Sequence, residues 1–473
     1  MTQPTTQPGG THAVVRDDAV RADVSTSLPG RRALDGAPPT GPAFARGLWR
    51  IAAADVSSGN AVALLTDGPA TYDVMLAAIA AARETVALES YILRSDETGQ
   101  RFAAALVAAV ERGVSVRLLT DWIGMRGIRS AFVADLRRAG VDVRVFNAPG
   151  LRAWFGLVPR DHRKLLVVDG AVGITGGVGI GDEWMGETKR HRGHWRDTAV
   201  RIEGPAARFM QSAFDTMWQR AQKRERRGSH RLTRRIARGA HLDPSTAEPA
   251  LVGIVEGEPL RLRIARALQI QAISAERSIW IANAYFVPSW SEIEALMGAA
   301  RDGVDVRILV PQRNDHPWVT LLTRRYYRRL LTNGVRIWEF RGAMMHAKTS
   351  VVDGRWVRVG STDFNPLGVA INYELDAVIE DARLGAQAEA MFLGDLERSK
   401  EITMRSRSGS PCTIPTSAGS AVDGSRWAPR ATRRASRCEP RRSRFCTRSH
   451  IVSKADCMSR AAGPSMRTAV SRQ

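Results

Sequence analysis

Two stretches of the chain combine a histidine with a lysine two positions later and an aspartate five positions after that. The pattern occurs at His162, Lys164 and Asp169, and again at His346, Lys348 and Asp353. Seven residues after each aspartate comes a turn of small residues, at Gly176 and Gly177 in the first copy and at Gly360 and Ser361 in the second. An imidazole can attack phosphorus or exchange a proton with an alkoxide, and an ammonium group can hold a phosphate oxygen. The two histidine–lysine pairs therefore predict chemistry on a phosphodiester.

The spacing of the motif indicates how its side chains are placed. On a strand, residues i and i+2 point to the same face, so each histidine should project together with its lysine. The apolar residues that follow bury the strand, and the Asp-Gly pair that ends it fits a turn into the next strand. Within the motif, Asp169 and Asp353 are therefore predicted to be turn and scaffold residues rather than reacting groups.

Each motif closes one copy of a longer repeat. Ahead of it, strands and helices alternate in the same order in both halves, with a glycine turn opening the later strands. The matching segments are 81–93, 107–122 and 136–147 in the first half, and 274–287, 297–312 and 330–340 in the second. Such alternation is typical of βαβ units. We predict an α/β protein with two pseudo-symmetric α/β domains, each a mixed, largely parallel sheet flanked by helices, and one active site shared between them.

Positive charge and cysteine are concentrated at the C-terminal end. Residues 405–473 hold 15 Lys and Arg against three Asp and Glu, and therefore 12 of the 21 net positive charges, together with all four cysteines. This stretch has no apolar periodicity and is rich in Arg and Ser, which predicts a disordered tail. The predicted organisation is a disordered N-terminal segment (1–42), a first domain (43–220), a basic linker (221–250), a second domain (251–404) and the basic tail (405–473).

The remaining composition predicts the compartment and the cofactor requirement. The chain contains no apolar run of about 18 residues, and its first residues lack the pattern of a secretory signal. We expect a peripheral protein on the cytoplasmic side of the cell membrane, without a signal peptide or a transmembrane helix. Ahead of the tail there is no cysteine and no carboxylate cluster with the spacing of a metal site, so a site without metal or other cofactor is expected.

From about residue 60 to 404 the sequence resembles the phospholipase D superfamily, whose signature is two such motifs, each followed by a turn of small residues. It is most similar to bacterial cardiolipin synthases of the type without N-terminal transmembrane helices. The segments that support this resemblance are HRKLLVVDG, HWRDTAVRIEGPA, HAKTSVVDG, VGSTD, NPLG and INYELD. The resemblance implies the phospholipase D fold and a reaction that joins two phosphatidylglycerol molecules into cardiolipin, releasing glycerol.

The same resemblance implies roles for individual residues. His162 is expected to take up the phosphatidyl group, and His346 to protonate the departing glycerol and then deprotonate the incoming hydroxyl, although the symmetry of the sequence allows the two roles to be exchanged. Lys164 and Lys348 are expected to hold the phosphate. In the family a downstream carboxylate orients each histidine, and Asp197 and Glu374 stand at the matching places.

The sequence departs from the family pattern in both turns. The family places an asparagine, whose amide helps to bind phosphate, three residues after the first glycine of each turn. Here these positions hold Gly179 and Asp363. Glycine removes a hydrogen-bond donor, and aspartate adds a negative charge beside the phosphate. Asn365, two residues after Asp363, is a candidate substitute.

The expected partner is an anionic phospholipid membrane that contains phosphatidylglycerol, with no specific nucleic acid. The segment Leu151–Leu157, directly ahead of the first motif, combines Trp, Phe and Arg as interfacial loops do. A second mixture of aromatic residues and arginines follows in the second half, at Tyr285, Phe286, Trp290, Trp318, Tyr326 and Tyr327 with Arg324, Arg325, Arg328 and Arg329.

Three other functions use the same residues. Water in place of an alcohol makes the protein a phospholipase D that releases phosphatidic acid. The same superfamily chemistry also serves nucleases, although the chain ahead of the tail is only mildly basic and shows no nucleic-acid module. A lipid-binding relative without activity is the third alternative, because Gly179 and Asp363 replace the family asparagines.

Overall fold

A computed structural model describes residues 41–147, 159–186, 194–225, 240–241 and 250–404. Almost all of the expected N-terminal segment, the loop Leu151–Leu157 and the expected C-terminal tail lie outside these residues. The described part opens with two short helical segments, α1 (Pro42–Gly47) and a π-helix η2 (Leu48–Ala52).

The first half continues with strands and helices in alternation. Its strands are β1 (Asp55–Leu65), β2 (Thr85–Ser90), β3 (Ser115–Asp121), β4 (Asp142–Phe146), β5 (Lys164–Val168), β6 (Val172–Gly176), β7 (Trp195–Arg196) and β8 (Ala199–Glu203). Its helices are α2 (Gly68–Ala81), α3 (Glu97–Glu111), α4 (Ser130–Arg138), the 3-10 turn η4 (Asp182–Trp184) and α5 (Pro205–Glu225).

The second half repeats this order. Its strands are β9 (Ala240–His241), β10 (Ala250–Gly257), β11 (Ser278–Asn283), β12 (Asp305–Pro311), β13 (Arg336–Phe340), β14 (Met344–Met345), β15 (Lys348–Val352), β16 (Trp356–Gly360), β17 (Glu374–Glu380) and β18 (Ser399–Ile402). Its helices are α6 (Arg263–Ser274), α7 (Trp290–Arg301), α8 (Pro317–Thr332), the π-helix η5 (Leu367–Ile371) and α9 (Ala382–Glu397). The repeat predicted from the sequence is thus present in the fold.

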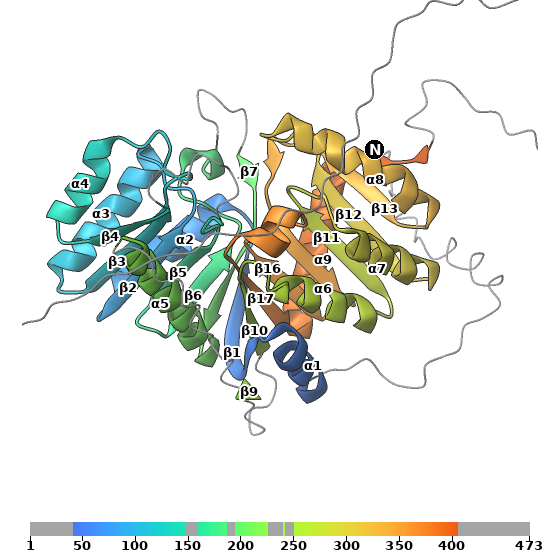
Figure 1. Cartoon of the computed structure of the whole chain (residues 1–473), viewed down its shortest axis with the longest axis horizontal. Coiled ribbons are helices and arrows are strands. Elements are labelled where there is room, and N and C mark those ends of the chain that lie inside the picture. The colour runs from blue at the N-terminus through green and yellow to red at the C-terminus, as the bar shows by residue number, and fades with distance from the viewer. Residues whose placement is uncertain (1–40, 148–158, 187–193, 226–239, 242–249, 405–473) are drawn as a thin grey trace, which may run out of the picture. The chain divides into compact units, whose positions relative to one another are not determined.

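Both halves contribute to one continuous sheet, in the order β18-β13-β12-β11-β15-β16-β17-β10-β1-β8-β6-β5-β2-β3-β4. Read outward from its centre, the two wings use equivalent strands, from β1 and β10 to β4 and β13. The wings meet where β1 and β10 pair in antiparallel register, with Asp55 opposite Ile254. In Figure 1 the first half (blue to green) and the second half (yellow to orange) meet at these two strands. An antiparallel central pair is the arrangement expected for two copies related by a pseudo-twofold axis.

The direction of the strands corrects one expectation. The sheet is mixed, as predicted, but it is not largely parallel. Along this order, parallel pairing occurs only among the outer strands, β2-β3-β4 and β11-β12-β13, and the two-residue strand β9 adds a short parallel pair with β1. The motif strands β5 and β15 pair antiparallel with β2 and β11, and the strands between them and the centre are antiparallel as well. The Asp-Gly turns account for the antiparallel hairpins β5–β6 and β15–β16, and the remaining antiparallel pairs join strands farther apart in the sequence, whose direction the local βαβ pattern does not specify.

Helices cover both faces of the sheet. One core cluster runs across both wings and includes the apolar sides of α5 and α9, with Phe214 and Phe392 among its buried members. On the opposite face, α2, α3 and α4 pack on the first wing and α6 and α7 on the second, together with Tyr327 and Leu330 of α8. This three-layer arrangement keeps the sheet buried on both faces, which accounts for the apolar strand sequences.

Local sequence signals set the ends of these elements. Ser289 and Glu292 form a reciprocal capping box at the start of α7, and Asp381 caps α9 by accepting a hydrogen bond from the Leu384 amide at 2.7 Å. Gly113 and Gly303 adopt left-handed φ angles of 83° and 90° just ahead of β3 and β12. They end α3 and α7 as the sequence predicted.

Part of the expected linker is structured. Residues 221–225 are the last residues of α5, which packs on the sheet, and Ala250 already belongs to β10. Of the residues between them, only the short strand β9 is described, where it pairs with β1. The first residues of the expected linker therefore belong to a helix that packs in the core.

Candidate active site

The two histidine–lysine pairs lie at equivalent places in the sheet. Lys164 and Lys348 are the first residues of β5 and β15, and each histidine lies two residues ahead of its strand. In both copies the lysine Nζ donates a hydrogen bond to the carbonyl oxygen of its own histidine at 2.6 Å. Lys164 is paired with Ser90 and Lys348 with Asn283, so both lie beside the carboxyl ends of β2 and β11.

Each histidine is held by a carboxylate from the other half of the chain. The Nδ1 of His162 lies 3.0 Å from Oε1 of Glu374, and the Nδ1 of His346 lies 2.7 Å from Oδ2 of Asp197. The sequence singled out both carboxylates but did not indicate that the pairs cross between the halves. Because each half completes the other's histidine, the two motifs form one composite site.

Backbone hydrogen bonds reinforce this crossing. The amide of His162 donates to the carbonyl oxygen of Tyr373 at 2.9 Å, and the amide of His346 donates to that of Arg196 at 2.7 Å. Tyr373 and Arg196 directly precede Glu374 and Asp197, so each histidine is fixed both through its backbone and through its ring. The short parallel pair β7–β14 is part of this contact.

The turns of small residues make room for the carboxylates. A Cβ atom on Gly177 would lie 2.1 Å from Oδ1 of Asp197, so this position tolerates only glycine. At the equivalent position of the second half, Ser361 donates its hydroxyl to Glu374 and accepts a hydrogen bond from the Leu375 amide. The glycines that precede them, Gly176 and Gly360, also lack space for a Cβ, because Thr198 and Asp376 respectively lie against them.

Asp169 and Asp353 are structural residues in the sense that the spacing indicated. Both adopt left-handed φ angles, of 52° and 53°, at the hairpin turns. Each carboxylate accepts hydrogen bonds from three consecutive backbone amides, those of residues 83–85 for Asp169 and 276–278 for Asp353. These contacts tie the motif hairpins to the starts of β2 and β11.

The electrostatics of the two histidine–carboxylate pairs differ. Burial lowers the pKa of His162, helped by the positive charges of Lys164, Lys348 and His346. Burial also raises the pKa of Glu374 to about 8, against the opposing effects of Lys164 and the Ser361 hydroxyl. Burial therefore disfavours the state in which His162 is protonated and Glu374 is ionised.

The second pair favours an ionised carboxylate. Although burial acts in the opposite direction, the charge and hydrogen bond of His346, the charge of Lys348 and the indole N–H of Trp184 together lower the pKa of Asp197. Trp184 donates to Asp197 at 2.9 Å. The Asp197 carboxylate therefore places a negative charge beside the ring of His346. Burial also lowers the pKa of Lys164 to about 8.

The positions of the missing family asparagines are occupied in different ways. Asp363 is buried, and its Oδ1 lies 3.3 Å from the Nζ of Lys348. Asn365 does not take over the phosphate-binding position, because its amide donates to the Tyr285 carbonyl and its oxygen accepts from the Gly368 amide. On the other side, a Cβ on Gly179 would lie 2.7 Å from the ring of Trp184.

Two tyrosines that the sequence analysis did not assign to the site complete it. The ring of Tyr91 packs edge-on against His162, with centroids 4.7 Å apart, and lies 5.3 Å from the Nζ of Lys164. Tyr285 repeats the arrangement with His346 and Lys348, at 5.9 Å and 5.4 Å. The sequence offered a signal, because an aromatic residue follows each of these strands closely: Tyr91 lies one residue after the end of β2, and Tyr285 lies two residues after the end of β11.

A buried charged cluster beneath His162 was also missed. Arg163 is fully buried and lies 3.1 Å from Oε2 of Glu256 on β10. Asp161 and Glu89 lie close by, and burial together with the charge of Asp161 raises the pKa of Glu89. Ala347 takes the place of Arg163 in the second half, where the surroundings are apolar. This cluster fixes the first motif strand to the second half of the chain.

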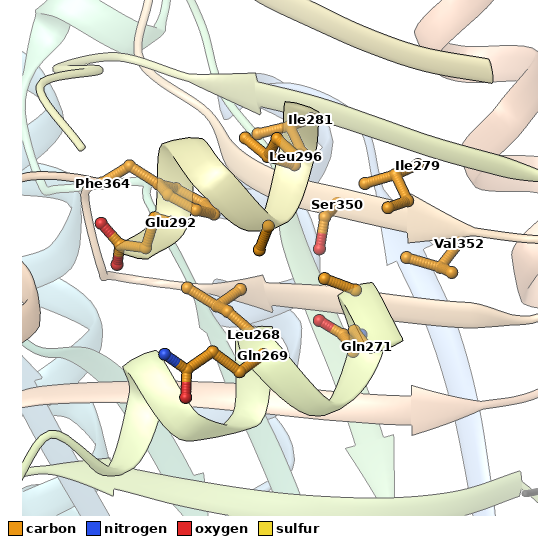
Figure 2. Close-up of a pocket in the computed structure, with 12 residues that line it drawn as sticks. Leu268, Gln269, Gln271, Ile279, Ile281, Glu292, Leu296, Ser350, Val352 and Phe364 are labelled. Atoms are coloured by element: carbon orange, nitrogen blue, oxygen red, sulfur yellow. The ribbon is translucent and has the colours of Figure 1, made fainter. Parts of the chain in front are cut away.

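A separate small cavity lies behind the second motif strand, between α6, α7 and the sheet (Figure 2). Its volume is about 30 Å³. Gln271 and Ser350 line it with polar atoms that have no hydrogen-bond partner among the described residues. A volume of this size suits a few water molecules, so the cavity is not a place for a phospholipid head group.

Two further findings concern the described residues as a whole. Among them, no three His, Cys, Asp or Glu side chains are grouped as a metal ion would require. No helix in the described ranges combines the length and the apolar character needed to cross a membrane.

Comparisons with known proteins agree with this geometry. Residues 75–218 and 269–396 match the family model described as cardiolipin synthase, PLD-like domain. The chain is 32% identical over 350 residues to a cardiolipin synthase of Oceanobacillus iheyensis, which covers 74% of this chain and 71% of that protein. It is 33% identical over 349 residues to the major cardiolipin synthase of Bacillus subtilis, covering 73% and 70% of the two chains.

Among solved structures, the phosphatidylserine synthase of Haemophilus influenzae matches with a TM-score of 0.59 at 14% identity, over 76% of this chain and 92% of that one. That likeness concerns the fold. A duplicated α/β fold with one histidine–lysine pair from each half defines an enzyme of the phospholipase D type. Within that class, the chain belongs to the cardiolipin synthase family with the PLD-like domain.

Proposed function

We propose that the protein is a phosphatidyltransferase that condenses two phosphatidylglycerol molecules into cardiolipin and glycerol through a phosphatidyl-histidine intermediate. The observation that carries this proposal is the reciprocal pairing of the two histidines with carboxylates of the opposite half. It supplies a nucleophile and a proton donor in one site, beside two lysines that can hold a phosphate. The cardiolipin synthases among its relatives support the choice of substrate.

In the first step, Nε2 of His162 attacks the phosphorus of phosphatidylglycerol. A phosphorus–nitrogen bond forms, the bond from phosphorus to the head-group oxygen breaks, and glycerol takes a proton from His346 as it leaves. Lys164 and Lys348 hold the non-bridging oxygens as negative charge develops on them. The hydrogen bond of Nδ1 to Glu374 leaves Nε2 directed into the site.

The electrostatics favour this division of labour over the reverse. Because burial lowers the pKa of His162, its imidazole is neutral and can act as the nucleophile. Because the pKa of Asp197 is lowered, its carboxylate places a negative charge beside His346, which suits this histidine to the role of the acid. The sequence left the two roles interchangeable, and the unequal environments of the two rings support this assignment.

In the second step, the hydroxyl of another phosphatidylglycerol enters. His346, now neutral, accepts its proton, the oxygen attacks phosphorus, and the bond to His162 breaks. Cardiolipin leaves, and both histidines return to their starting protonation states. Water that enters in place of the alcohol gives phosphatidic acid instead.

We also propose that the chain is organised as two phospholipase D-like halves, 43–220 and 251–404, and acts peripherally on an anionic membrane at its cytoplasmic face. The two separate matches to the family model support the first point. Anionic lipids of the cytoplasmic leaflet attract basic surfaces, and exposed arginines near the site support the second.

The test is turnover of phosphatidylglycerol labelled in its glycerol head group and acyl chains, with cardiolipin, phosphatidic acid and glycerol followed together. We expect cardiolipin and free glycerol in equal amounts. Phosphatidic acid as the main product refutes the transferase in favour of a phospholipase D. No turnover of lipid, combined with cleavage of plasmid DNA, indicates a nuclease.

Variants in the two histidines test the composite site. His162→Ala and His346→Ala should each abolish turnover, and a folded His162→Ala should form no phosphorus–nitrogen adduct. Substantial activity in either variant refutes a site shared by both halves. Ile273→Glu, an exposed change on α6, is the matched control and should remain fully active.

A further inference from the structure

The edge of the sheet that carries the active site also carries exposed apolar side chains. The two lysines mark this edge, since they pair with residues at the carboxyl ends of β2 and β11. Helices α7 and α8 begin at the same edge, after β11 and β12. Trp290, the first residue of α7, is 57% exposed, and Trp318 and Leu321 in the first turn of α8 are 58% and 68% exposed. Large apolar side chains grouped in solvent mark an interaction surface.

Aromatic contacts connect this surface to the catalytic histidine. Tyr285 packs against the ring of His346. His316 in turn lies 6.0 Å from the Tyr285 ring, and Trp318 stacks on His316 at 6.3 Å. Three ring side chains, Trp318, His316 and Tyr285, therefore lie between a molecule that covers Trp318 and the ring of His346.

The exposed face of α8 is basic beyond its first turn. Leu321 is followed on the same face by Arg325 and Arg328, both exposed. The neighbouring Arg329 places its guanidinium 3.7 Å from the ring centroid of Trp290, which joins α7 to the same surface.

The first half repeats this character at the equivalent place. The loop after β3, which corresponds to the loop after β12, exposes Arg126 and Arg129 beside the half-buried Trp122 and Ile128. Basic and apolar residues therefore border the composite site from both halves. This repetition favours a flat partner that reaches both sides of the site at once.

We propose that the surface formed by Trp290, Trp318, Leu321, Arg325 and Arg328, called the docking rim below, binds to an anionic phospholipid bilayer and brings lipid head groups to the histidines. The inference rests on the proposed function, because a substrate anchored in a bilayer reaches the site only where the site's edge meets the membrane. Aromatic side chains suit the head-group level, and arginines suit its negative charge. Charge complementarity therefore selects an anionic membrane as the occupant.

The experiment measures partitioning of the full-length protein onto vesicles of phosphatidylglycerol and phosphatidylcholine, and onto vesicles of phosphatidylcholine alone. Two variants remove the apolar and the basic parts of the docking rim separately: Trp318→Glu with Leu321→Glu, and Arg325→Ala with Arg328→Ala. Ile273→Glu is the matched control, because Ile273 is 84% exposed near the end of α6 that leads into β11, away from the site's edge. The basic tail is common to all the proteins, so its contribution is the same in each.

We expect wild type and Ile273→Glu to bind anionic vesicles and to bind phosphatidylcholine weakly. The arginine variant should bind about 30-fold more weakly, since each arginine near an anionic surface contributes about 1 kcal/mol. The Trp318→Glu, Leu321→Glu variant should bind anionic vesicles at least tenfold more weakly, because it can no longer bury these two apolar side chains in the bilayer. Equal binding by all four proteins overturns the proposal, as does a lack of binding by wild type.

A second measurement separates this proposal from that of the function. Turnover of a short-chain phosphatidylglycerol, monomeric in solution, should be the same in the rim variants and in wild type, whereas turnover on vesicles should fall with binding. If wild type binds vesicles through the docking rim but turns over neither substrate, the function is wrong and the docking surface stands. If the rim variants lose retention on DNA rather than on vesicles, the partner is a nucleic acid and the membrane proposal is refuted.

Discussion

Replacing Asp363 by asparagine should strengthen phosphate binding. The Oδ1 of Asp363 lies 3.3 Å from the Nζ of Lys348. A phosphate oxygen held by the same ammonium at the usual distance of about 2.8 Å is then no more than about 6 Å from the carboxylate. Two like charges at this separation repel by about 3 kcal/mol at the effective dielectric constant of about 20 that suits protein sites. Because Asp363 is only 4% exposed, solvent screens this repulsion little.

The amide of Asp363→Asn has the same size, removes the charge and can donate a hydrogen bond to the phosphate. Each 1.4 kcal/mol corresponds to about a factor of ten, so the KM for phosphatidylglycerol should fall by roughly 10- to 100-fold. The value of kcat should rise or stay level, because the negative charge on the non-bridging oxygens grows in the transition state. Without ligand the variant should be less stable, since Lys348 loses its buried partner.

The assay is steady-state kinetics on phosphatidylglycerol in mixed micelles, combined with thermal unfolding with and without inorganic phosphate. Phosphate should raise the Tm of Asp363→Asn more than that of wild type. Asp142→Asn is the control, because it removes the same charge from the exposed start of β4. An unchanged or higher KM in Asp363→Asn, with the fold intact, refutes the placement of this carboxylate beside the phosphate.

Three further predictions follow from the unequal halves. Gly179→Asn should not restore the family's phosphate ligand: its Cβ meets the Trp184 ring at 2.7 Å, so chemical denaturation should show a loss of about 1–3 kcal/mol and activity should fall as well. Asp197→Asn should lower kcat by roughly 10²–10⁴ with little change in Tm, as expected when a buried carboxylate no longer fixes the histidine tautomer, and a tenfold or smaller effect contradicts that role. The pH profile of kcat/KM should have an optimum near 8, because the pKa values of Glu374 and Lys164 are both about 8. The value of kcat/KM should rise on the acid side as the carboxyl of Glu374 ionises, and it should fall on the alkaline side as Lys164 loses its proton. Glu374→Gln should remove the acid limb and Lys164→Arg the alkaline limb, and profiles unchanged by both substitutions contradict the assignment.

The elements and the repeat could be predicted because they depend on local sequence. Apolar runs such as VDVRVF and VDVRIL, each after a glycine with a left-handed φ, became β4 and β12 with bounds displaced by one or two residues. The direction of the strands could not be predicted in the same way. A βαβ unit and a hairpin both join two strands, and the repeat alone does not fix how many of the joins are hairpins.

The partners of the histidines depend on contacts between distant residues. Asp197 lies 149 residues from His346, and Glu374 lies 212 residues from His162. Pairing within each half uses the same residue types and the same local spacing, so the sequence contains no signal that distinguishes it from the crossed arrangement. The crossed arrangement depends on the central β1–β10 pair, which joins the two wings into one sheet with both motif strands in it. Arg163 was missed for a related reason, because its partner Glu256 is on a strand of the other half.

The two halves share a frame and differ at the positions where a two-step transfer needs them to differ. Gly177 gives Asp197 room to approach, whereas its counterpart Ser361 donates a hydroxyl to Glu374. Asp197 is held by an indole donor and stays charged, whereas burial raises the pKa of Glu374. A fully symmetric site would give both histidines the same proton affinity, and neither would be favoured as nucleophile or as acid. Small substitutions around a duplicated frame therefore give the two imidazoles unequal electrostatic surroundings, and Asp363 adds a buried carboxylate beside Lys348 in one half only.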